Sequence, residues 1–208
     1  MEAQPTLLLL SVSLGLAGSA PASAEPPSSQ QLYGRHCESC HGPRGAGSEA
    51  LKAPALAGLD ASYLSRQLHD FASGRRSIEG IPLARAMVAL LETLPAGDID
   101  RIAAHAAQLP PVHLEQTLPS TGFRGRGLYS GCSSCHGSQG SGTPELGAPR
   151  IAGQHAWYLR AQLRRFRSGQ RGADPKDTRG QQMRTMALAI ASDEDLEVLV
   201  NYVAGMKP

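Results

Sequence analysis

Apolar residues recur at helical spacing in four segments of the chain, and these segments form two similar pairs. The pattern Tyr-Leu-x-x-Gln-Leu-x-x-Phe places its apolar side chains on one helical face and predicts a helix that begins near Asp60 and ends at Gly74. The same pattern returns later and predicts a helix that ends at Gly169. Two further helices are expected over Asp98–Gln108 and Asp193–Ala204. Because no segment alternates with the period of two that a half-buried strand requires, the predicted fold class is all-α.

An internal duplication explains the paired pattern. A shift of 95 residues aligns residues 37–76 with 132–171 without a gap, and 21 of the 40 aligned positions are identical. This period is too long for a solenoid repeat, so we expect two tandem domains of about 90 residues. Between them, residues 109–120 contain three prolines and no helical period, which indicates an extended linker. We place the N-terminal domain with this linker at 25–119 and the C-terminal domain at 120–208.

The first 24 residues resemble an export signal. Leu7–Leu16 is a short apolar run and Ala22-Ser23-Ala24 is a small-residue cleavage motif, so we expect residues 1–24 to be a signal peptide that is removed. The segment before the run carries Glu2 and no basic residue, which is atypical of such a signal and questions where the chain truly starts. An uncleaved membrane anchor would need about 20 apolar residues, and this run is broken earlier.

Composition and charge fit a folded protein without a strong electrostatic bias. Hydrophobic residues make up 41% of the chain and charged residues 18%, and residues 25–208 hold 20 basic against 17 acidic side chains. That balance is far from the strongly basic one that is typical of nucleic-acid binding. Nine residues are aromatic, which is few for two packed domains, so we expect a bound group to complete each core.

Each predicted domain carries one Cys-x-x-Cys-His motif. Two thiols one helical turn apart, followed directly by an imidazole, form the attachment motif of c-type haem, because the sulfurs meet two vinyl groups of the porphyrin and the histidine becomes the proximal iron ligand. The alternatives are two disulfides, which would leave the histidines unexplained, a thioredoxin-like site, which needs a βαβ context, and a zinc site shared between the domains. We therefore expect two covalently bound haem c groups. The attachment cysteines would be Cys37, Cys40, Cys132 and Cys135, and the proximal iron ligands would be His41 and His136.

The sixth iron ligand is expected to be a methionine in each domain. Met87 is the one methionine of the predicted N-terminal domain and follows His41 by 46 residues. In the C-terminal domain Met183 follows His136 by 47 residues, the closest spacing, and Met186 is the alternative. A methionine ligand raises the potential of the iron and closes the site to substrates. The competing interpretation of Met87 is a core methionine on an amphipathic helix.

The remaining histidines could replace a methionine and give a bis-histidine haem of lower potential. Three of them align with Arg164, Tyr202 and Asp60 in the other copy, whereas a duplicated site should use a duplicated ligand. We therefore expect surface or packing roles for these histidines, with His105 in a closing helix as the strongest alternative ligand. The full set is His36, His69, His105, His113 and His155.

With these motifs the chain resembles the diheme class I cytochromes c, and most of all the cytochrome c4 group of bacterial periplasmic proteins. The resemblance runs from about residue 30 onward and rests on both Cys-x-x-Cys-His-Gly motifs, on Ala152–His155 and on the Ser192–Leu196 start of the last helix. It implies two tandem cytochrome c domains, each wrapped around one haem with His/Met ligation, and haems that exchange electrons through their propionate edges. It also implies that the carbonyls of Pro54 and Pro149 accept the N–H of the proximal histidines.

Charge is divided unequally between the predicted domains, with a net charge of −2 on residues 25–119 and +5 on residues 120–208. Five arginines crowd the middle helix of the second domain and could steer it toward an acidic redox partner or into peripheral association with a membrane surface. The alternative is a solvated helix face. These arginines are Arg160, Arg164, Arg165, Arg167 and Arg171.

An electron shuttle of the periplasm is the leading functional hypothesis. One haem would receive electrons from a respiratory donor such as the cytochrome bc complex, and the other would reduce a terminal oxidase or reductase, without acid–base catalysis by any side chain. The alternative is the diheme electron-transfer subunit of a dehydrogenase such as flavocytochrome c sulfide dehydrogenase. A diheme peroxidase or thiosulfate-oxidising enzyme is the third hypothesis, and it needs an open or unusual distal site. We therefore expect redox proteins as partners and no enzymatic activity.

Overall fold

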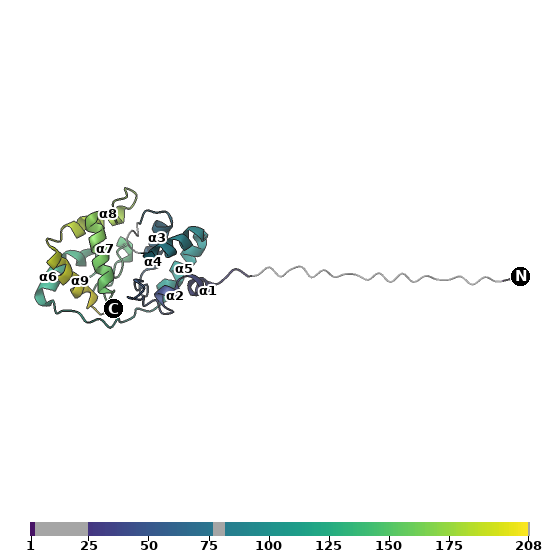
Figure 1. Cartoon of the computed structure of the whole chain (residues 1–208), viewed down its shortest axis with the longest axis horizontal. Coiled ribbons are helices and arrows are strands. Elements are labelled where there is room, and N and C mark those ends of the chain that lie inside the picture. Colours follow the sequence, from purple (N-terminus) through teal and green to yellow (C-terminus); the bar gives the residue numbers. More distant parts are fainter. Residues whose placement is uncertain (3–24, 77–81, 208) are drawn as a thin grey trace.

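The regular secondary structure of the protein is helical in the computed structural model, which describes residues 1–2, 25–76 and 82–207 (Figure 1). The predicted signal peptide lies almost wholly outside the described residues. Between the described residues, β-pairing is limited to two isolated bridges, Ser48–Ala53 and Thr143–Ala148. The all-α prediction is confirmed. The elements are α1 (Ser29–His36), α2 (Glu38–His41), α3 (Ala61–Ala72), α4 (Pro82–Thr93), α5 (Ala96–Gln108), α6 (Gly122–His136), the short 3-10 helix η1 (Pro144–Leu146), α7 (Ala156–Ser168), α8 (Thr178–Leu188) and α9 (Asp193–Ala204).

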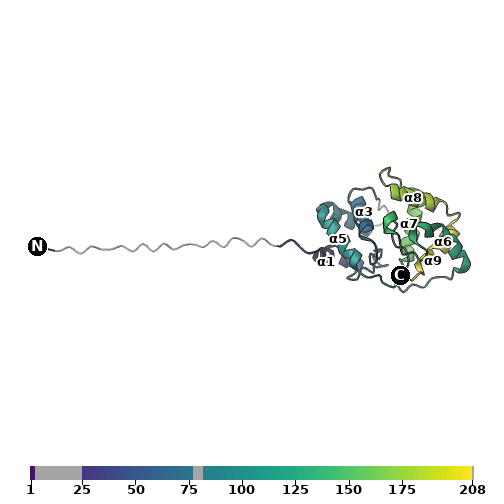
Figure 2. The same cartoon turned by 180° about the vertical axis from the view of Figure 1, so that it is seen from behind.

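The helices gather in two lobes, one built from α1–α5 and the other from α6–α9 (Figure 1), and the view from behind shows the same division (Figure 2). In the first lobe α1 and α3 both pack on α5, and α4 packs on α3. In the second lobe α6 and α7 both pack on α9, and α8 packs on α7. The duplicated sequence therefore folds into a duplicated topology, and the expectation of two tandem helical domains is confirmed. No helix in the described part of the chain is long and apolar enough to cross a membrane.

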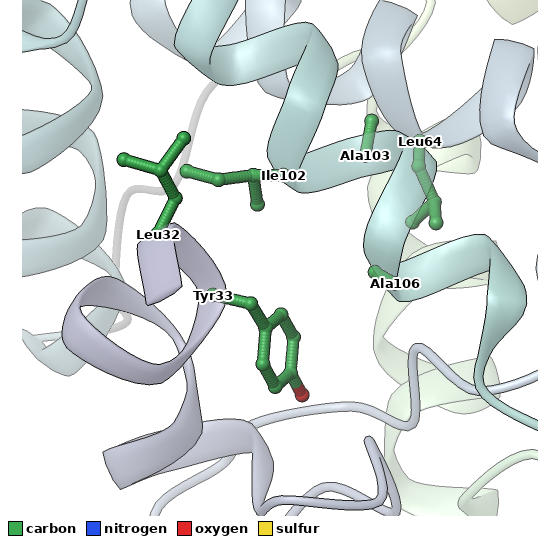
Figure 3. Close-up of a cluster of buried hydrophobic side chains, with 6 residues drawn as sticks. All are labelled: Leu32, Tyr33, Leu64, Ile102, Ala103 and Ala106. Atoms are coloured by element: carbon green, nitrogen blue, oxygen red, sulfur yellow. The ribbon is translucent and has the colours of Figure 1, made fainter. Parts of the chain in front are cut away.

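The core of the N-terminal domain lies where α1, α3 and α5 meet (Figure 3). Two large side chains come from α1 and one leucine comes from α3, whereas α5 contributes one isoleucine and two alanines that let its neighbours approach closely. Burial of these apolar side chains supplies the main favourable free energy for packing the helices. The six residues are Leu32, Tyr33, Leu64, Ile102, Ala103 and Ala106.

The core of the C-terminal domain uses the same face of its closing helix with larger side chains. Leu196 and Val200 of α9 are fully buried, and Leu199 and Val203 pack against Tyr129 of α6. When the two closing helices are aligned on Asp98 and Asp195, the two valines fall where α5 has alanines. The second domain therefore buries more apolar surface along its closing helix, which favours stability.

Polar caps explain where the predicted helices begin. The Asp60 carboxylate accepts hydrogen bonds from the backbone N–H groups of Ser62 and Tyr63, so α3 starts where the sequence indicated. The Ser192 hydroxyl accepts from the Asp195 N–H in the same way at α9. The closing helix of the first domain begins at Ala96, two residues before the predicted start, with Pro95 as its N-cap. The structure also adds α1, α2, α4, α6, η1 and α8 to the four predicted helices.

The predicted linker, residues 109–120, contains no helix. Along most of it every second side chain is half-buried against the domains, and the side chains between are exposed. The Gly58 N–H donates to the Leu109 carbonyl at 3.0 Å, which holds the start of the linker against the first domain. Farther on, the Gln116 side chain accepts from the Ala156 N–H at 2.9 Å and donates to the Gln154 carbonyl at 3.2 Å. The linker is therefore fixed to both domains.

Direct hydrogen bonds also join the two domains. The Gln154 side chain accepts from the Ala55 N–H at 3.0 Å and donates to the Ala55 carbonyl at 2.9 Å, as a strand neighbour would. The His155 ring lies 3.0 Å from the Ala46 carbonyl through Nε2. Because Gln154 and His155 are both buried, these bonds are made away from water and fix the orientation of the domains.

Candidate functional site: two equivalent cysteine–histidine centres

The two cysteine pairs lie on one helical turn each. In the first domain Cys37 lies between α1 and α2, and its carbonyl accepts from the His41 N–H at 2.9 Å, which places Cys40 and His41 on the next turn. In the second domain α6 runs without interruption through Cys132, Cys135 and His136. The spacing that the haem motif requires is therefore present twice.

All four cysteines are free thiols, so the two-disulfide alternative is wrong for this structure. Burial, helped by the neighbouring Cys40, raises the pKa of Cys37 to about 12, and burial raises the pKa of Cys132 as well. A thioredoxin-like site needs a cysteine whose pKa is lowered, so these raised pKa values argue against that alternative. Within the described residues no group of three or more His, Cys, Asp or Glu side chains could hold a metal ion, which also argues against zinc.

Each motif histidine is buried and oriented by a proline carbonyl. His41 is 9% exposed and its Nδ1 lies 2.9 Å from the Pro54 oxygen, while His136 is 6% exposed and its Nδ1 lies 2.8 Å from the Pro149 oxygen. A carbonyl can only accept, so Nδ1 carries the proton and Nε2 keeps its lone pair. Burial lowers the pKa of both rings, although the carbonyl bond partly opposes this. Both imidazoles are therefore neutral and have one nitrogen available for iron.

Tight loops bring the proline carbonyls to the histidines. Gly47 and Gly142 have φ of 78° and 86°, and a Cβ at either position would come within 2.7 Å of a backbone carbon of Pro54 or Pro149. Glycine is therefore required at both turns. The loops repeat their hydrogen bonds, because the Gly47 N–H donates to the His41 carbonyl at 2.9 Å and the equivalent Gly142 bond has the same length.

The methionines differ in how far they are buried. Met87 is half-buried on the face of α4 that includes the buried Leu91. Met183 is half-buried and shares a face of α8 with the buried Gly180 and Ala187, whereas Met186 is 42% exposed. The fold therefore turns Met183 inward and Met186 outward. Met206, at the end of the chain, packs against the core of the second domain.

Four of the five other histidines have partners elsewhere. His69 bonds Asp100 at 3.0 Å, the His105 ring packs at a tilt against Tyr33 with ring centroids 5.2 Å apart, and His113 lies 3.8 Å from Glu115. His155 is part of the domain contact described above. His36 is half-buried in the last turn of α1.

The helix arginines of the second domain are mostly engaged within the molecule. Arg160 and Arg164 both pair with Glu197 of α9, at 2.7 and 3.1 Å, and Arg167 pairs with Asp193 at 2.6 Å. Arg171 reaches into the domain interface. These contacts tie α7 to α9 and leave a less basic helix face than the count of arginines suggests.

The donor set fits a haem in each domain. Each motif offers two thiols and a neutral imidazole, and each domain adds a half-buried methionine on another helix; these are the side-chain types that attach and ligate haem c. In the second domain, buried Trp157 Nε1 and Arg184 Nε have no hydrogen-bond partner in the described structure. Orphaned buried N–H donors are costly, and the carboxylates of a haem are acceptors that would satisfy them.

Two tandem helical domains with one such centre each define a diheme cytochrome c. The cytochrome c family model matches residues 28–105 and 123–207. Cytochrome c4 of Pseudomonas aeruginosa is 34% identical over 208 residues, which cover 96% of this chain and 98% of that one. The thiosulfate dehydrogenase electron acceptor of Stutzerimonas stutzeri is 36% identical over 188 residues, which cover 82% of this chain and 78% of that one. The crystal structure of reduced recombinant cytochrome c4 from Pseudomonas stutzeri superposes with a TM-score of 0.70 at 30% identity, covering 86% of this chain and 97% of that chain.

The chain belongs to the cytochrome c family, as a diheme protein of the cytochrome c4 type. Its two cytochrome c domains each hold one Cys-x-x-Cys pair, consistent with two covalent haem c groups. It is therefore a diheme electron carrier, and its relatives imply redox proteins as partners.

Proposed function

We propose specific roles for the residues of the two centres. Cys37 and Cys40 in the first domain, and Cys132 and Cys135 in the second, would hold one haem each through thioether bonds to its vinyl groups. Addition of a thiol S–H across a vinyl group is neutral in electrons, so this attachment would need no external oxidant. Burial raises the pKa of Cys37 and of Cys132, which favours the neutral S–H form of these two thiols.

The axial ligands proposed for the iron are His41 with Met87, and His136 with Met183. The single observation that carries this assignment is the repeated geometry of a neutral, carbonyl-bound imidazole, at 2.9 Å in one domain and 2.8 Å in the other. The hydrogen bonds that the rings donate to the Pro54 and Pro149 carbonyls hold each imidazole in one tautomer and increase its basicity. Met183 is preferred to Met186 because its side chain faces inward on α8. When bound, each haem supplies reversible one-electron exchange, and methionine ligation keeps its potential high.

We propose that the protein carries electrons in the periplasm from a respiratory donor such as the cytochrome bc complex to a terminal oxidase or reductase. Support comes from the two equivalent centres, from the apolar N-terminal segment with its cleavage motif, and from the similarity to cytochrome c4 over nearly the whole chain. Helices and carbonyls hold the ligands rigidly, so little rearrangement accompanies a change of iron charge.

A second candidate is the electron acceptor of a dehydrogenase. The observation that favours it is a relative named as the electron acceptor of thiosulfate dehydrogenase, 36% identical over 82% of this chain. In this proposal the donor is a thiosulfate-oxidising enzyme instead of a quinol-oxidising complex. The flavocytochrome c sulfide dehydrogenase subunit remains an alternative of the same kind, and stable copurification with a flavoprotein would support it.

The test is a spectroelectrochemical titration of the haem-loaded protein, followed by mixing with each donor. We expect two low-spin couples of high potential, both with the charge-transfer band of Met-to-iron ligation. Stopped-flow reduction by the cytochrome bc complex and by thiosulfate dehydrogenase then separates the two candidates by their rates. A high-spin or low-potential haem would contradict His/Met ligation in that domain and would reopen an enzymatic hypothesis.

A further inference from the structure

The carbonyl that orients each motif histidine belongs to a peptide unit whose other end carries an N–H group. Pro54 supplies the carbonyl in the first domain, and the N–H of the same peptide unit is that of Ala55. In the second domain the carbonyl is that of Pro149 and the N–H is that of Arg150. A peptide unit is rigid and planar, so whatever bonds its N–H also acts on the histidine at its other end.

In the first domain this N–H is bonded by a side chain of the other domain. Gln154 Oε1 accepts from the Ala55 N–H at 3.0 Å, while the carbonyl of the same peptide unit accepts from His41 Nδ1 at 2.9 Å. The Gln154 amide also donates to the Ala55 carbonyl at 2.9 Å, which fixes its orientation. Ala55 is 6% exposed and Gln154 is 8% exposed, so water competes weakly for these bonds. A continuous chain of hydrogen bonds therefore runs from Gln154 to His41.

In the second domain the equivalent chain is missing. A shift of 95 residues places Leu59 where the second domain has Gln154, and leucine has no acceptor atom. Within the described residues the Arg150 N–H forms no hydrogen bond, and the Arg150 guanidinium bonds the Ala152 carbonyl at 3.3 Å. Leu59 and Arg150 line an open cleft of about 460 Å³ between the domains. One half of the domain contact is therefore filled by a glutamine, and the other half is open.

We propose that Gln154 is a positioning residue for His41 of the other domain, and that it lowers the potential of the first haem by a contribution that the second haem lacks. This inference rests on the proposed ligation of iron by His41 and His136. An acceptor on a peptide N–H polarises the peptide and makes its carbonyl a stronger acceptor. The stronger bond from His41 Nδ1 makes the ring a better electron donor to iron, which favours the oxidised state.

The effect crosses the domain boundary in one direction. Gln154 belongs to the second domain by sequence, yet its loss changes the haem attached to the first domain, because its acceptor oxygen bonds the Ala55 N–H. The reciprocal exchange can be made as well, since the cleft beside Leu59 has room for a glutamine, which is only slightly longer than leucine. Leu59→Gln gives the Arg150 N–H the acceptor that it lacks, and so extends the same control to the second haem.

The experiment compares Gln154→Leu and Leu59→Gln with the parental holoprotein. Redox titration gives the two potentials, and proton NMR of the haem methyl groups assigns each potential to its domain. Proton NMR of the reduced protein also follows the Nδ1 proton of each motif histidine, which moves downfield when its hydrogen bond strengthens.

For Gln154→Leu we expect the ratio of reduced to oxidised haem at a fixed applied potential to rise about threefold in the first domain alone. This is about 28 mV for a one-electron couple, in which tenfold is 59 mV. The Nδ1 proton of His41 should move upfield. Leu59→Gln should have the opposite effects in the second domain, with a lower potential and a downfield shift of the His136 proton.

The matched control is Gln116→Leu. The Gln116 side chain makes the same pair of backbone bonds, to the Ala156 N–H and to the Gln154 carbonyl, but neither group belongs to a peptide unit that bonds a motif histidine. We expect the potentials and the Nδ1 resonances of this variant to equal those of the parent. Changes as large as those of Gln154→Leu would show that the potentials follow the contact between the domains in general, and would overturn the inference.

The inference also fails if Gln154→Leu leaves the potential of the first haem and the His41 proton unchanged, or if both haems change by the same amount. If Gln154→Leu does not load haem, Leu59→Gln provides an independent test, and an unchanged second haem then contradicts the inference. The Met-to-iron band of the parent is recorded in the same samples. If both haems show that band, the proposed ligation stands even when this inference fails, whereas its absence overturns both.

Discussion

The two domains repeat one motif but support it differently. In the first domain the attachment segment breaks at Cys37, whose φ of −121° separates α1 from α2, whereas α6 is continuous through Cys132. The closing helices also differ, because α9 has Val200 where α5 has Ala103. Even so, both motif histidines meet their proline carbonyls at nearly the same distance. The geometry around the imidazole has therefore been kept after duplication while the packing behind it has diverged.

The polar side-chain contacts that join the middle helix of each domain (α3 or α7) to its closing helix (α5 or α9) also differ between the domains. In the second domain α7 is held to α9 by arginine–carboxylate pairs, with Glu197 accepting from both Arg160 and Arg164. In the first domain the equivalent tie is made by Ser65 and His69, which both bond Asp100 at 2.6 and 3.0 Å. Both contacts contain a carboxylate, but the partners of Glu197 are arginines, which stay charged at any pH that the protein meets, whereas one partner of Asp100 is an imidazole, which can titrate. The two domains should therefore respond differently to acid.

The largest expected effect comes from removing an axial methionine in one domain at a time. Met87→Ala and Met183→Ala should each abolish the Met-to-iron band of one haem and lower its potential, leaving the other domain unchanged. The expected drop is on the order of 0.1 V or more, since axial ligands set haem potentials over roughly 0.8 V. Optical titration of each variant measures both quantities.

Met186→Ala is the matched control for that comparison, because Met186 lies three residues farther along α8 and is exposed. We expect a spectrum and potentials like those of the parent. If Met186→Ala removes the band and Met183→Ala does not, the ligand of the second domain is Met186, and α8 must turn on binding haem.

A smaller effect should follow from exchanging the core residues in which the closing helices differ. Val200→Ala gives α9 the residue of α5 and should destabilise the second domain by about 2 kcal/mol, the cost of two buried carbons and the space they leave. The reverse exchange, Ala103→Val, should cost about 1–3 kcal/mol through overpacking between α1 and α3. Urea unfolding of the holoproteins measures both. If Ala103→Val were more stable than the parent, the core of the first domain would have unfilled space beside Ala103, and the expectation of overpacking would be wrong.

Local sequence signals were sufficient for part of this architecture. Four helices were predictable from apolar periodicity, and the caps at Asp60 and Ser192 mark their starts because a side-chain oxygen beside free N–H groups is a local device. The helix α6 was not predicted, since its glycine-rich sequence has little periodicity and it forms by packing on α9. The capping box of α1, formed by Ser28 and Gln31, was a readable signal that the prediction missed.

Contacts between distant segments could not be derived from periodicity. The arginines of α7 looked like a basic surface, and their pairing with Glu197 and Asp193 becomes visible only when α9 is placed beside them. Likewise, Arg76 and Arg171 are identical positions of the repeat, but their approach depends on how the domains dock. The motif cysteines and histidines were predictable because haem attachment fixes their spacing within five residues. The choice between Met183 and Met186 needed the burial of the folded helix.

The smallest expected effect concerns the exposed hydrogen bonds that Ser65 and His69 of α3 make with Asp100 of α5. Hydrogen bonds from Ser65 and then His69 lower the pKa of Asp100 below its ordinary value of 3.8. A carboxylate whose pKa is lowered on folding stabilises the folded state above its ordinary pKa, and this stabilisation is lost as the pH falls through the folded value. Asp100→Asn should therefore cost about 0.5 kcal/mol near pH 7, as for other exposed pairs, and the difference from the parent should vanish in strong acid.

Urea unfolding of the holoprotein at pH 7 and at successively lower pH measures this difference, with Glu115→Gln on the exposed linker as a control that should change nothing. A deficit that persists unchanged in acid would mean that Asp100→Asn disturbs the contact of α3 with α5 by its shape, not by its charge. The acid response of the first domain would then lie elsewhere. A deficit that disappears would show that the contact of α3 with α5 acts through the charge of Asp100, which is bonded by a serine and a histidine, whereas the equivalent carboxylate of the second domain, Glu197, is bonded by arginines.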